Sequence, residues 1–421
     1  MKFQDLSNKK IVIWGTGKEG ISVKTVLENK TTNSHISFVT EENISDIYTA
    51  DILIKSPGVS LYRDEIKKAK ELGIYCTSGS NIFFKNKNPK TKIVAVTGTK
   101  GKSTTASLIA HTLNKFGIST GLAGNIGTPL ITLIDSNYDV ITAELSSYQT
   151  ADLRAKTDIA ILTNLYPEHL QWHNTHEQYY QDKINLLNQS DISVINQGQN
   201  QSIQKTQHLK NKLFFNTENG IYFKDGFFFD NKDPLFETKA LPLIGDHNLE
   251  NATAVLTLLK KWNLDLKKAE KAFSDFKALN HRLQIIGEKD GVTFVDDSIS
   301  TTPETAVAAL KSFRTSPFLT LIVGGTDRGQ NHQVLINYLK TIKEKSFLIT
   351  LPDTGKRAFL EAEKENIFCH QASSMQEAVI LAKKYTPRGG VVLLSPAAPS
   401  YNLYKNFEER GCDFSKKVFL S

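Results

Sequence analysis

The clearest chemical signal in the chain is a short segment rich in glycine and lysine. The segment is Gly98-Thr99-Lys100-Gly101-Lys102-Ser103-Thr104. It follows an apolar run, IVAV, and precedes a helical pattern, so it predicts a strand–loop–helix unit. Glycine lets backbone N–H groups turn toward phosphate oxygens, and the start of a helix adds partial positive charge. The segment therefore predicts a mononucleotide site, which we assign to ATP, although Val96 stands where the longer form of this loop has its first glycine.

Side chains of this loop and two later residues have the chemistry that ATP and Mg²⁺ require. Lys102 would reach the β- and γ-phosphates, and the hydroxyl of Ser103 or Thr104 would coordinate Mg²⁺. Glu144 ends the apolar run VITAEL, and His169 follows another apolar run, in NLYPEHLQWH. The carboxyl ends of strands face the ligand crevice of an open α/β sheet, so both residues are candidate neighbours of Mg²⁺. Taken alone, each residue is explained better by an ordinary position, a solvated glutamate or a core or surface histidine.

A second glycine pattern, Gly15-x-Gly17-x-x-Gly20, lies near the N-terminus between an apolar run and a helical pattern. This position suits a bound diphosphate. Glu41 or Glu42 stands about 20 residues further on, where a dinucleotide-binding loop has its acidic residue. By itself the pattern leaves a redox cofactor and a structural turn equally open.

Three blocks of alternating strands and helices are expected to position these residues. The first, residues 1–90, has strands at KIVIW, HISFVT and DILIK, a helix at Arg63 to Leu72, and a polar stretch at residues 83–92 that predicts a linker. The second, residues 91–277, adds strands at VITAEL and IAILTNL and a helix near Glu177 to Leu187. Asn-Gly and Asp-Gly in KLFFNTENGIYFKDGFFFD predict hairpin turns, and GDHNLENA begins a pattern that indicates an amphipathic helix.

The third block, residues 278–421, has short apolar runs at GVTFVDDS, FLTLIVGG, SFLITLP and GGVVLLSP, separated by helical patterns. A chain of 421 residues is too long for one ordinary core. We therefore predict an α/β protein with three domains, at 1–90, 91–277 and 278–421.

The composition is that of a globular protein, with 40% hydrophobic and 23% charged residues. A net charge of +7 favours substrates that carry phosphates and carboxylates. Nucleic-acid binding is not supported, because the sequence has no Arg-rich run. Three cysteines without a CxxC pattern indicate a reduced compartment. Because no signal peptide or membrane-spanning run is present, we expect a cytoplasmic protein without a membrane partner, and a monomer.

Several segments, in order over nearly the whole chain, resemble the Mur ligase family. TGTKGKST resembles the family's ATP loop, ELSSYQ (144–149) its glutamate-bearing strand end, and NLYPEHL (164–170) the segment with its histidine. Lys183 stands at the position that is carbamylated in the family. GDHNLENA (245–252) resembles the asparagine motif at adenine, and HRLQ (281–284) and DDS (296–298) resemble the segments that bring an arginine and an aspartate to ATP.

The resemblance implies a Rossmann-like UDP-binding domain, a central P-loop ATPase-like domain and a Rossmann-like C-terminal domain. It also implies an ATP-dependent, ADP-forming amide ligase that activates a carboxylate as an acyl phosphate, with two Mg²⁺ ions and a carbamylated lysine. The implied catalytic residues are Lys102, Glu144, His169 and Lys183, and the implied metal ligands are Ser103, Glu144, His169 and carbamylated Lys183. Beyond the loop itself, the residues implied for ATP are Asn248, Asn251, Arg282 and Asp297.

Within the family, the resemblance is strongest to glutamate-adding members, through SPG (56–58), GGTDRG (324–329) and the ending LLSPAAPSYNLYKNFEERGCDF. These members act on UDP-N-acetylmuramoyl-L-alanine in peptidoglycan synthesis, which reassigns the first glycine pattern to a uridine diphosphate. The implied nucleotide-substrate residues are Gly15, Thr16, Gly17, Asn125 and Ser146. The implied glutamate residues are Thr301, Arg328, Ser400 and Phe407.

The glutamate enantiomer is left open by this resemblance. D-glutamate is the usual substrate of such members, but Ile299 stands where their lysine lies close to the incoming amino acid. DDSISTTPE and the YQT of ELSSYQT resemble a less common branch that adds L-glutamate and is followed by an epimerase. The DNPR motif of the diaminopimelate-adding member is absent.

Three other functions explain less of the chain. A folylpolyglutamate synthetase has a similar ATP loop but accounts for neither the first block nor LLSPAAPS. A nicotinamide-dependent oxidoreductase leaves the second glycine loop, His169 and Lys183 unexplained. An inactive binding protein is disfavoured because Lys102, Glu144 and Asp297 are also in place.

Overall fold

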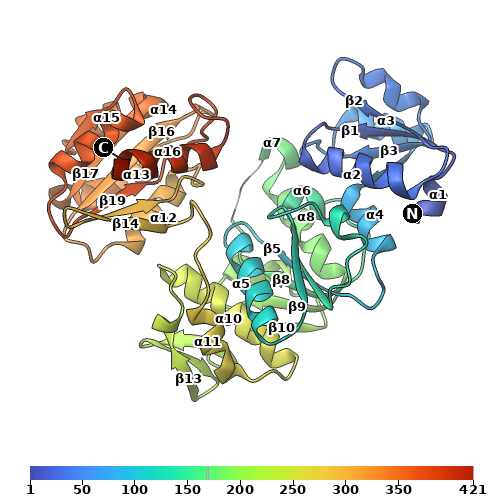
Figure 1. Ribbon diagram of the computed structural model, residues 1–421, viewed down its shortest axis with the longest axis horizontal. Helices are drawn as coiled ribbons and strands as arrows, with labels where there is room; N and C mark the ends of the chain where they lie inside the picture. The colour runs from blue at the N-terminus through green and yellow to red at the C-terminus, as the bar shows by residue number, and fades with distance from the viewer. Residues whose placement is uncertain (167, 169, 421) are drawn as a thin grey trace. The chain divides into compact units, whose positions relative to one another are not determined.

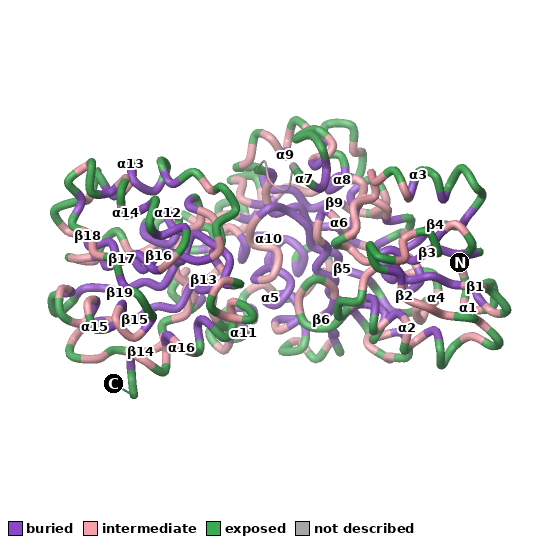
Figure 2. The backbone as a smooth tube through the Cα atoms, turned by 90° about the horizontal axis from the view of Figure 1, so that it is seen from above, coloured by how far each residue is buried: buried purple, intermediate pink, exposed green. Residues whose placement is uncertain are grey.

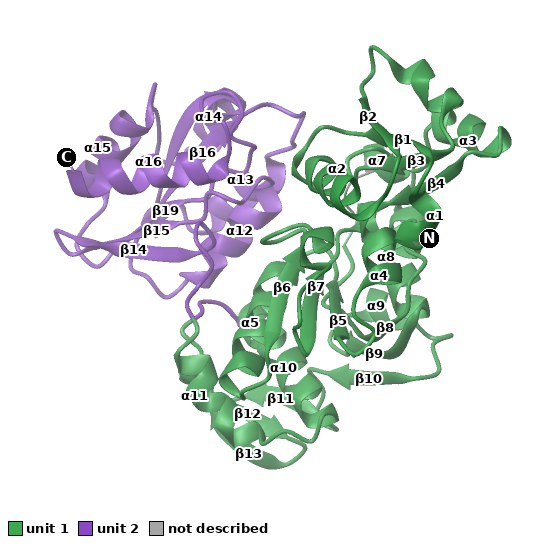
Figure 3. Ribbon diagram, turned by 45° about the vertical axis from the view of Figure 1, so that its right-hand side comes forward, with its two compact units in different colours: residues 1–242, 247–276 green, residues 243–246, 277–421 purple. Residues whose placement is uncertain are grey.

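The computed structural model describes residues 1–166, 168 and 170–420, and divides into two compact units. Unit 1 comprises residues 1–242 and 247–276, and unit 2 comprises residues 243–246 and 277–421 (Figure 3). The predicted site residue His169 lies outside the described residues. Across the described part of the chain, none of the helices combines the length and apolar character that crossing a bilayer requires.

The first sheet of unit 1 is parallel, with strand order β2-β1-β3-β4. Its strands are β1 (Lys10–Trp14), β2 (His35–Val39), β3 (Ile52–Lys55) and β4 (Tyr75–Ser78). The helices of this part of the chain are α1 (Phe3–Leu6) before β1, then α2 (Lys18–Lys30), η1 (Ile44–Thr49) and α3 (Asp64–Glu71) between the strands, and α4 (Gly79–Asn86) after β4 (Figure 1). Residues 11–14 are buried on both faces of β1, as expected when helices cover a parallel sheet on both sides.

The second sheet of unit 1 has the order β13-β12-β11-β10-β9-β8-β5-β7-β6. Its parallel part consists of β5 (Lys92–Thr97), β6 (Thr120–Gly124), β7 (Val140–Glu144), β8 (Thr157–Leu162), β9 (Ser190–Asn196) and β10 (Lys212–Phe215). An outer part consists of β11 (Ile221–Lys224), β12 (Phe227–Asp230) and β13 (Asp233–Glu237). Because β5 lies between β7 and β8, the loop after β5 opens at the centre of the parallel part.

The helical segments with this sheet are α5 (Lys102–Lys115), η2 (Leu130–Leu133), α6 (Ser147–Thr150), α7 (Leu170–His173), α8 (His176–Asn188), α9 (Asn200–Lys205), η3 (Thr238–Ala240), α10 (Asp246–Lys261), η4 (Leu266–Lys268) and α11 (Ala269–Ser274). The buried stretches of the backbone run along the sheets, while exposed stretches follow many of the connecting loops (Figure 2).

Unit 2 contains a sheet of order β14-β15-β19-β16-β17-β18, in which only the β14–β15 pairing of the described strands is antiparallel. The strands are β14 (Gln284–Lys289), β15 (Val292–Asp296), β16 (Leu319–Gly325), β17 (Ser346–Asp353), β18 (Cys369–Gln371) and β19 (Val391–Leu394). The helices are α12 (Pro303–Ser312), α13 (Gln333–Thr341), η5 (Lys343–Lys345), α14 (Thr354–Lys364), α15 (Met375–Tyr385) and α16 (Phe407–Leu420).

The α/β class is confirmed, whereas three local expectations need correction. Asp225-Gly226 forms a hairpin turn between antiparallel β11 and β12, with positive φ at both residues. Asn219-Gly220 does not, because positive φ falls at Asn216 instead and β11 pairs with β10 in parallel. The predicted linker at 83–92 is shorter, since α4 continues to Asn86 and buries Phe83.

The third correction concerns α10, which was expected to be amphipathic. Residues 251–259 of this helix are all buried, so the helix is enclosed on every side along most of its length. The division into three domains at 1–90, 91–277 and 278–421 stays a prediction.

Candidate active site

The predicted ATP loop, residues 98–104, leaves β5 in a conformation that glycine adopts most easily. The φ angles are +143° at Gly98 and +83° at Gly101. A Cβ atom at Gly98 would lie 2.0 Å from the Thr163 hydroxyl oxygen, and one at Gly101 would lie 2.5 Å from Oδ1 of Asn251. Both glycines are therefore required by the available space as well as by the backbone.

Residues that follow β8 hold this loop from the side. The Lys100 amide donates to Oδ1 of Asn164 at 2.8 Å, and the Thr163 hydroxyl donates to the Lys100 carbonyl at 2.6 Å. The Thr99 amide donates to the Asn164 carbonyl at 3.0 Å. Sequence reasoning missed Thr163 and Asn164, although two polar residues directly after the apolar run IAIL were a usable signal.

The charged side chains of the loop lie close to its own backbone. Nζ of Lys102 donates to the Thr99 carbonyl at 2.9 Å, and Lys100 forms an ion pair with Glu168. Ser103 and Thr104 lie in the first turn of α5, which begins at Lys102. A helix start with an adjacent lysine is an arrangement that binds anionic oxygens.

Glu144 lies at the end of β7, directly beside β5, and its side chain is buried. Nδ2 of Asn125 donates to its Oε1 at 3.0 Å. Its other oxygen, Oε2, is also buried and accepts no hydrogen bond from the described residues. A buried carboxylate oxygen without a donor is costly, so this atom suits a cation near the ATP loop.

Lys183 is fully buried on α8 and reaches the same loop. Its Nζ donates to the Gly98 carbonyl at 2.7 Å and lies 4.9 Å from the ring centroid of Tyr179. Burial lowers the pKa of Lys183 well below its usual value, and the charge of Lys102 acts in the same direction. The environment therefore favours a neutral amine.

The fit of Mg²⁺ to this site rests on oxygen donors. Among the described residues, no three His, Cys, Asp or Glu side chains gather as a metal-binding group. Mg²⁺ is commonly held by one or two carboxylates together with phosphate oxygens and water, so a full protein cage is not needed. The Oε2 of Glu144, which accepts no hydrogen bond from the described residues, and the hydroxyl of Ser103 or Thr104 are oxygen ligands of the kind that such an ion takes.

The asparagines expected at adenine lie beside the start of α5. Asn248 and Asn251 are buried on α10, and Nδ2 of Asn251 donates to Oδ1 of Asn248 at 3.3 Å. Because Asn251 also lies against Gly101, the structure brings this pair to the ATP loop.

The loop between β1 and α2 contains Gly15, Thr16 and Gly17. A Cβ atom at Gly15, where φ is +116°, would lie 2.6 Å from Oγ of Ser56, so this loop packs on the SPG segment. Nζ of Lys18 donates to the Gly127 carbonyl at 2.7 Å, which links the loop to the turn that carries Asn125.

Ser146 follows two residues after Glu144, the last residue of β7. Its hydroxyl caps α6 by accepting from the Gln149 amide at 3.3 Å. Nε2 of Gln149 in turn approaches Glu19 of α2 at 3.4 Å. Burial raises the pKa of Glu19 to about 7. The segments that carry the residues expected to bind the nucleotide substrate are thus connected by contacts of α2 with α6 and with the turn at Gly127.

In unit 2, Arg282 and Asp297 occur together near the end of β15. Asp297 is buried and accepts from the hydroxyls of Ser300 at 2.5 Å and Ser395 at 2.8 Å. Burial raises the pKa of Asp297 to about 6, while these hydrogen bonds and the charge of Arg282 oppose that rise.

Arg410 organises the segments expected to bind glutamate. It is buried and donates to the Ser298 hydroxyl at 3.0 Å and to the Ala398 carbonyl at 3.1 Å. The Ser298 hydroxyl donates to the carbonyl of Phe407 at 2.8 Å. Arg410 therefore joins the DDS segment to the segment that leads to Ser400. Sequence reasoning missed it, although it lies in the quoted ending KNFEERG.

The remaining predicted glutamate residues are more exposed. The guanidinium of Arg328 lies 5.7 Å from the ring centroid of Tyr401, the residue after buried Ser400. Thr301 is exposed and follows the DDS segment.

Comparison with known proteins places these features in a family. Residues 96–259 match the Mur ligase middle domain, and residues 281–398 match the domain described as Mur ligase, glutamate ligase domain. A UDP-N-acetylmuramoyl-L-alanine--L-glutamate ligase of Micromonospora sp. is 32% identical over 450 residues, covering 99% of this chain and 98% of the relative. A ligase of the same name from Xylella fastidiosa is 35% identical over 395 residues, covering 90% and 84%.

Solved structures agree on the fold. MurF ligase from Thermotoga maritima in complex with ADP has a TM-score of 0.63 at 17% identity, covering 98% of this chain and 96% of that chain. UDP-N-acetylmuramate-alanine ligase MurC from the same organism has a TM-score of 0.61 at 19% identity, covering 97% and 99%. With both domain matches and relatives above 30% identity over nearly its full length, this chain belongs to the Mur ligase family of ATP-dependent, amide-bond-forming ligases.

Proposed function

We propose that this chain joins glutamate to UDP-N-acetylmuramoyl-L-alanine in peptidoglycan synthesis, acting in the cytoplasm as a monomer. The observation that carries the proposal is the convergence of three features on one loop. These are the glycine turn at Gly98, the free Oε2 of Glu144 and the buried amine of Lys183. The names of the relatives support the two substrates.

L-glutamate is the enantiomer that we propose. D-glutamate is the usual substrate of the glutamate-adding members that the sequence resembles. The relatives from Micromonospora and Xylella are named as L-glutamate ligases, however, and Ile299 replaces the usual lysine near the amino acid.

The first step makes an acyl phosphate. A carboxylate oxygen of the alanyl group attacks the γ-phosphorus of ATP, and the bond to the bridging oxygen breaks to release ADP. Lys102 stabilises the charge on the transferring oxygens, and Asn248 and Asn251 hold the adenine. Arg282 is assigned to ATP on the family resemblance alone. Asp297 is assigned to the ATP site on the family resemblance. Mg²⁺, when bound with help from Ser103, Glu144, His169 and Lys183, would neutralise phosphate charge.

Lys183 would contribute to this site as a carbamate. The neutral amine nitrogen forms a bond to the carbon of CO₂, an electron pair moves to one oxygen, and the amine releases a proton to water. The product is a carboxylate on a buried side chain, which supplies oxygen donors that a lysine lacks. Support comes from the burial of the amine, which favours its reactive neutral form.

The second step makes the amide. The glutamate nitrogen attacks the acyl carbon, the bond to the phosphate oxygen breaks, and the nitrogen loses a proton. Arg328 and Thr301 would hold one glutamate carboxylate, since a guanidinium can bind it through two parallel hydrogen bonds. Ser400 and the region of Phe407 would hold the other. Gly15, Thr16, Gly17, Asn125 and Ser146 would bind the nucleotide substrate.

The proposal predicts that phosphate release requires both substrates. Purified protein with ATP, Mg²⁺ and UDP-N-acetylmuramoyl-L-alanine should release phosphate at least about 100-fold faster with L-glutamate than with D-glutamate, because the wrong enantiomer misplaces a carboxylate. A coupled phosphate assay measures this. Phosphate release with D-glutamate only would show that D-glutamate is the substrate. No release with either enantiomer would contradict the proposed pair of substrates.

Replacing Gly98 by alanine should weaken ATP binding by at least roughly 100-fold, because the new Cβ would collide with Thr163 and distort the loop. The matched control is Gly226→Ala, which also places alanine at a positive φ but meets open space. Calorimetry with ATP should show wild-type affinity for the control. Equal ATP affinity of the two variants would show that the loop at Gly98 does not bind ATP.

Lys183→Ala should lower turnover by roughly 100-fold, with partial recovery when formate or acetate is added, since a small carboxylate can replace the carbamate. Lys87→Ala is a suitable control, because Lys87 is partly buried and, like Lys183, donates to a backbone carbonyl, that of Thr91 at 2.7 Å. Unchanged turnover of Lys183→Ala would exclude the carbamate from the mechanism.

A further inference from the structure

A chain of buried polar contacts lies beside the ATP loop and takes part in none of the steps above. Oγ of Ser147 lies 2.9 Å from Nε2 of His173, and Nδ1 of His173 lies 2.5 Å from Oδ2 of Asp182. The Tyr62 hydroxyl is 2.6 and 2.8 Å from the two Asp182 oxygens. Nε2 of Gln178 donates to Oδ1 of Asp182 at 2.8 Å. We call these five residues the Asp182 network.

The order serine–histidine–aspartate is that of a hydrolytic triad, but the surroundings exclude attack on a substrate. Ser147 is 2% exposed and His173 is 0% exposed. The imidazole is enclosed by aromatic rings, with centroids at 4.4 Å for Trp172 and 5.2 Å for Tyr179. A nucleophile that no substrate can reach does not catalyse, so the contacts must serve to hold the surrounding segments.

The segment that the network holds is α8. Asp182 directly precedes Lys183, and Tyr179 lies one turn earlier on the same helix. The Tyr179 hydroxyl is 3.0 Å from Oγ1 of Thr99, so α8 touches the ATP loop twice, through Tyr179 and through Lys183. Figure 1 and the residue contacts place α6, α7 and α8 side by side.

The contacts of Asp182 reach the elements around α8. His173 belongs to α7 and is bonded to Ser147 of α6, while Tyr62 lies between β3 and α3 of the first sheet. Asp182 is 4% exposed, and both of its oxygens accept hydrogen bonds. A buried carboxylate satisfied on both oxygens fixes its helix, because any shift leaves polar atoms unpaired.

The position of α8 matters because the contact that it supports is short. The Lys183 amine is 2.7 Å from the Gly98 carbonyl, and a displacement of about 1 Å is enough to cost a reacting site roughly 100-fold in rate. The helix therefore needs an anchor close to Lys183, and the preceding residue provides it.

We propose that Asp182 is a positioning residue, which fixes α8 so that the Lys183 amine stays against the ATP loop and which ties this position, through Tyr62, to the first sheet. This inference deepens the proposed function and rests on it for the role of Lys183. At 4% exposure, Asp182 is out of reach of a substrate.

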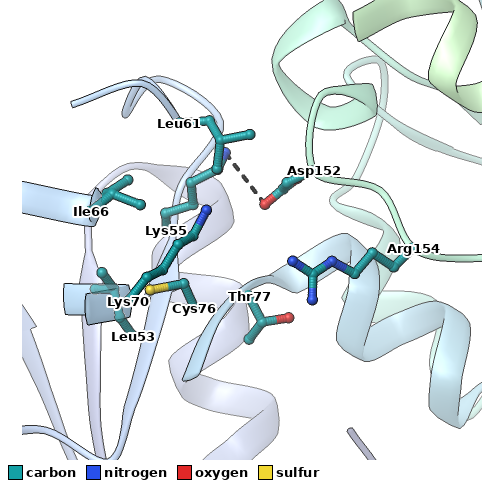
Figure 4. A pocket seen from close by; sticks show the side chains of 9 residues that line it. All are labelled: Leu53, Lys55, Leu61, Ile66, Lys70, Cys76, Thr77, Asp152 and Arg154. Carbon is teal, nitrogen blue, oxygen red and sulfur yellow. Dashed lines mark ion pairs between the residues drawn. The ribbon is translucent and has the colours of Figure 1, made fainter. Parts of the chain in front are cut away.

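The test compares Asp182→Asn with Asp152→Asn in the full chain. Asparagine keeps the size of Asp182 but places an N–H₂ group where an oxygen accepted. Asp152 is a matched control, because its Oδ2 is 3.7 Å from Nζ of Lys55 at the end of β3 (Figure 4). It thus joins the first sheet to the segment after α6, without a described hydrogen bond or ion pair to α8.

Asp182→Asn should lower kcat by about 10–100-fold and weaken the ¹³C NMR signal of a lysine carbamate formed from ¹³C-bicarbonate. It should also speed hydrogen exchange in residues 176–188. Asp152→Asn should stay within about 3-fold of wild type in kcat and keep the carbamate signal and the exchange of α8. Tyr62→Phe, which removes one hydroxyl only, should lower kcat by a smaller factor. If Asp182→Asn fails to fold, Tyr62→Phe takes its place in the comparison.

Equal kcat and equal α8 exchange in the two asparagine variants would overturn the positioning role. A wild-type protein without a carbamate signal would contradict the carbamate of the proposed function, and kcat and exchange would then decide the inference. A wild-type protein that releases no phosphate would contradict the proposed substrates. The positioning role of Asp182 would then be tested by comparing the hydrogen exchange of α8 and the affinity for ADP in the two asparagine variants.

Discussion

The candidate active site of unit 1 depends on one buried contact, the hydrogen bond from the Lys183 amine to the Gly98 carbonyl. A charged ammonium group is costly at a fully buried position, and burial moves the pKa of Lys183 downward accordingly. The acceptor is available because Gly98 adopts a positive φ, and a side chain at that position would collide with Thr163. The same glycine thus shapes the ATP loop and receives the lysine. β5, β8 and α8 must keep their relative positions for both to hold.

Unit 2 also buries an ionisable side chain, in this case the carboxyl group of Asp297. Asp297 is buried between the hydroxyls of Ser300 and Ser395, and burial raises its pKa. Arg410 is also buried, and the partners described above are hydroxyl and carbonyl oxygens rather than a carboxylate. A guanidinium satisfied by several carbonyls fixes the loops that provide them. Arg410, which the sequence motifs did not single out, therefore fixes the segments that are expected to bind glutamate.

The features that sequence predicted well are local ones. Gly98 and Gly101 were predicted because their spacing between a strand and a helix has a physical meaning within a few residues. The Asp182 network and the contact of Asn164 with the loop were missed, because the Tyr62–Asp182 contact spans 120 residues and the Lys100–Asn164 contact spans 64. No periodicity records such pairs. The hairpin expected at Asn219-Gly220 was wrong for a related reason, since the pairing of β10 with its neighbours decides the direction of the chain there. Lys183 was found through a family resemblance alone, and His169 lies outside the described residues.

The central claim is that the ATP loop, Glu144 and Lys183 serve to activate a carboxylate by phosphorylation. The most direct measurement uses UDP-N-acetylmuramoyl-L-alanine labelled with ¹⁸O in its carboxylate, together with ATP, Mg²⁺ and glutamate. An acyl phosphate breaks at the bond between carbon and oxygen, so the account predicts that one ¹⁸O atom appears in each phosphate released, as seen by mass spectrometry. Phosphate without ¹⁸O, released alongside amide product, would contradict the account.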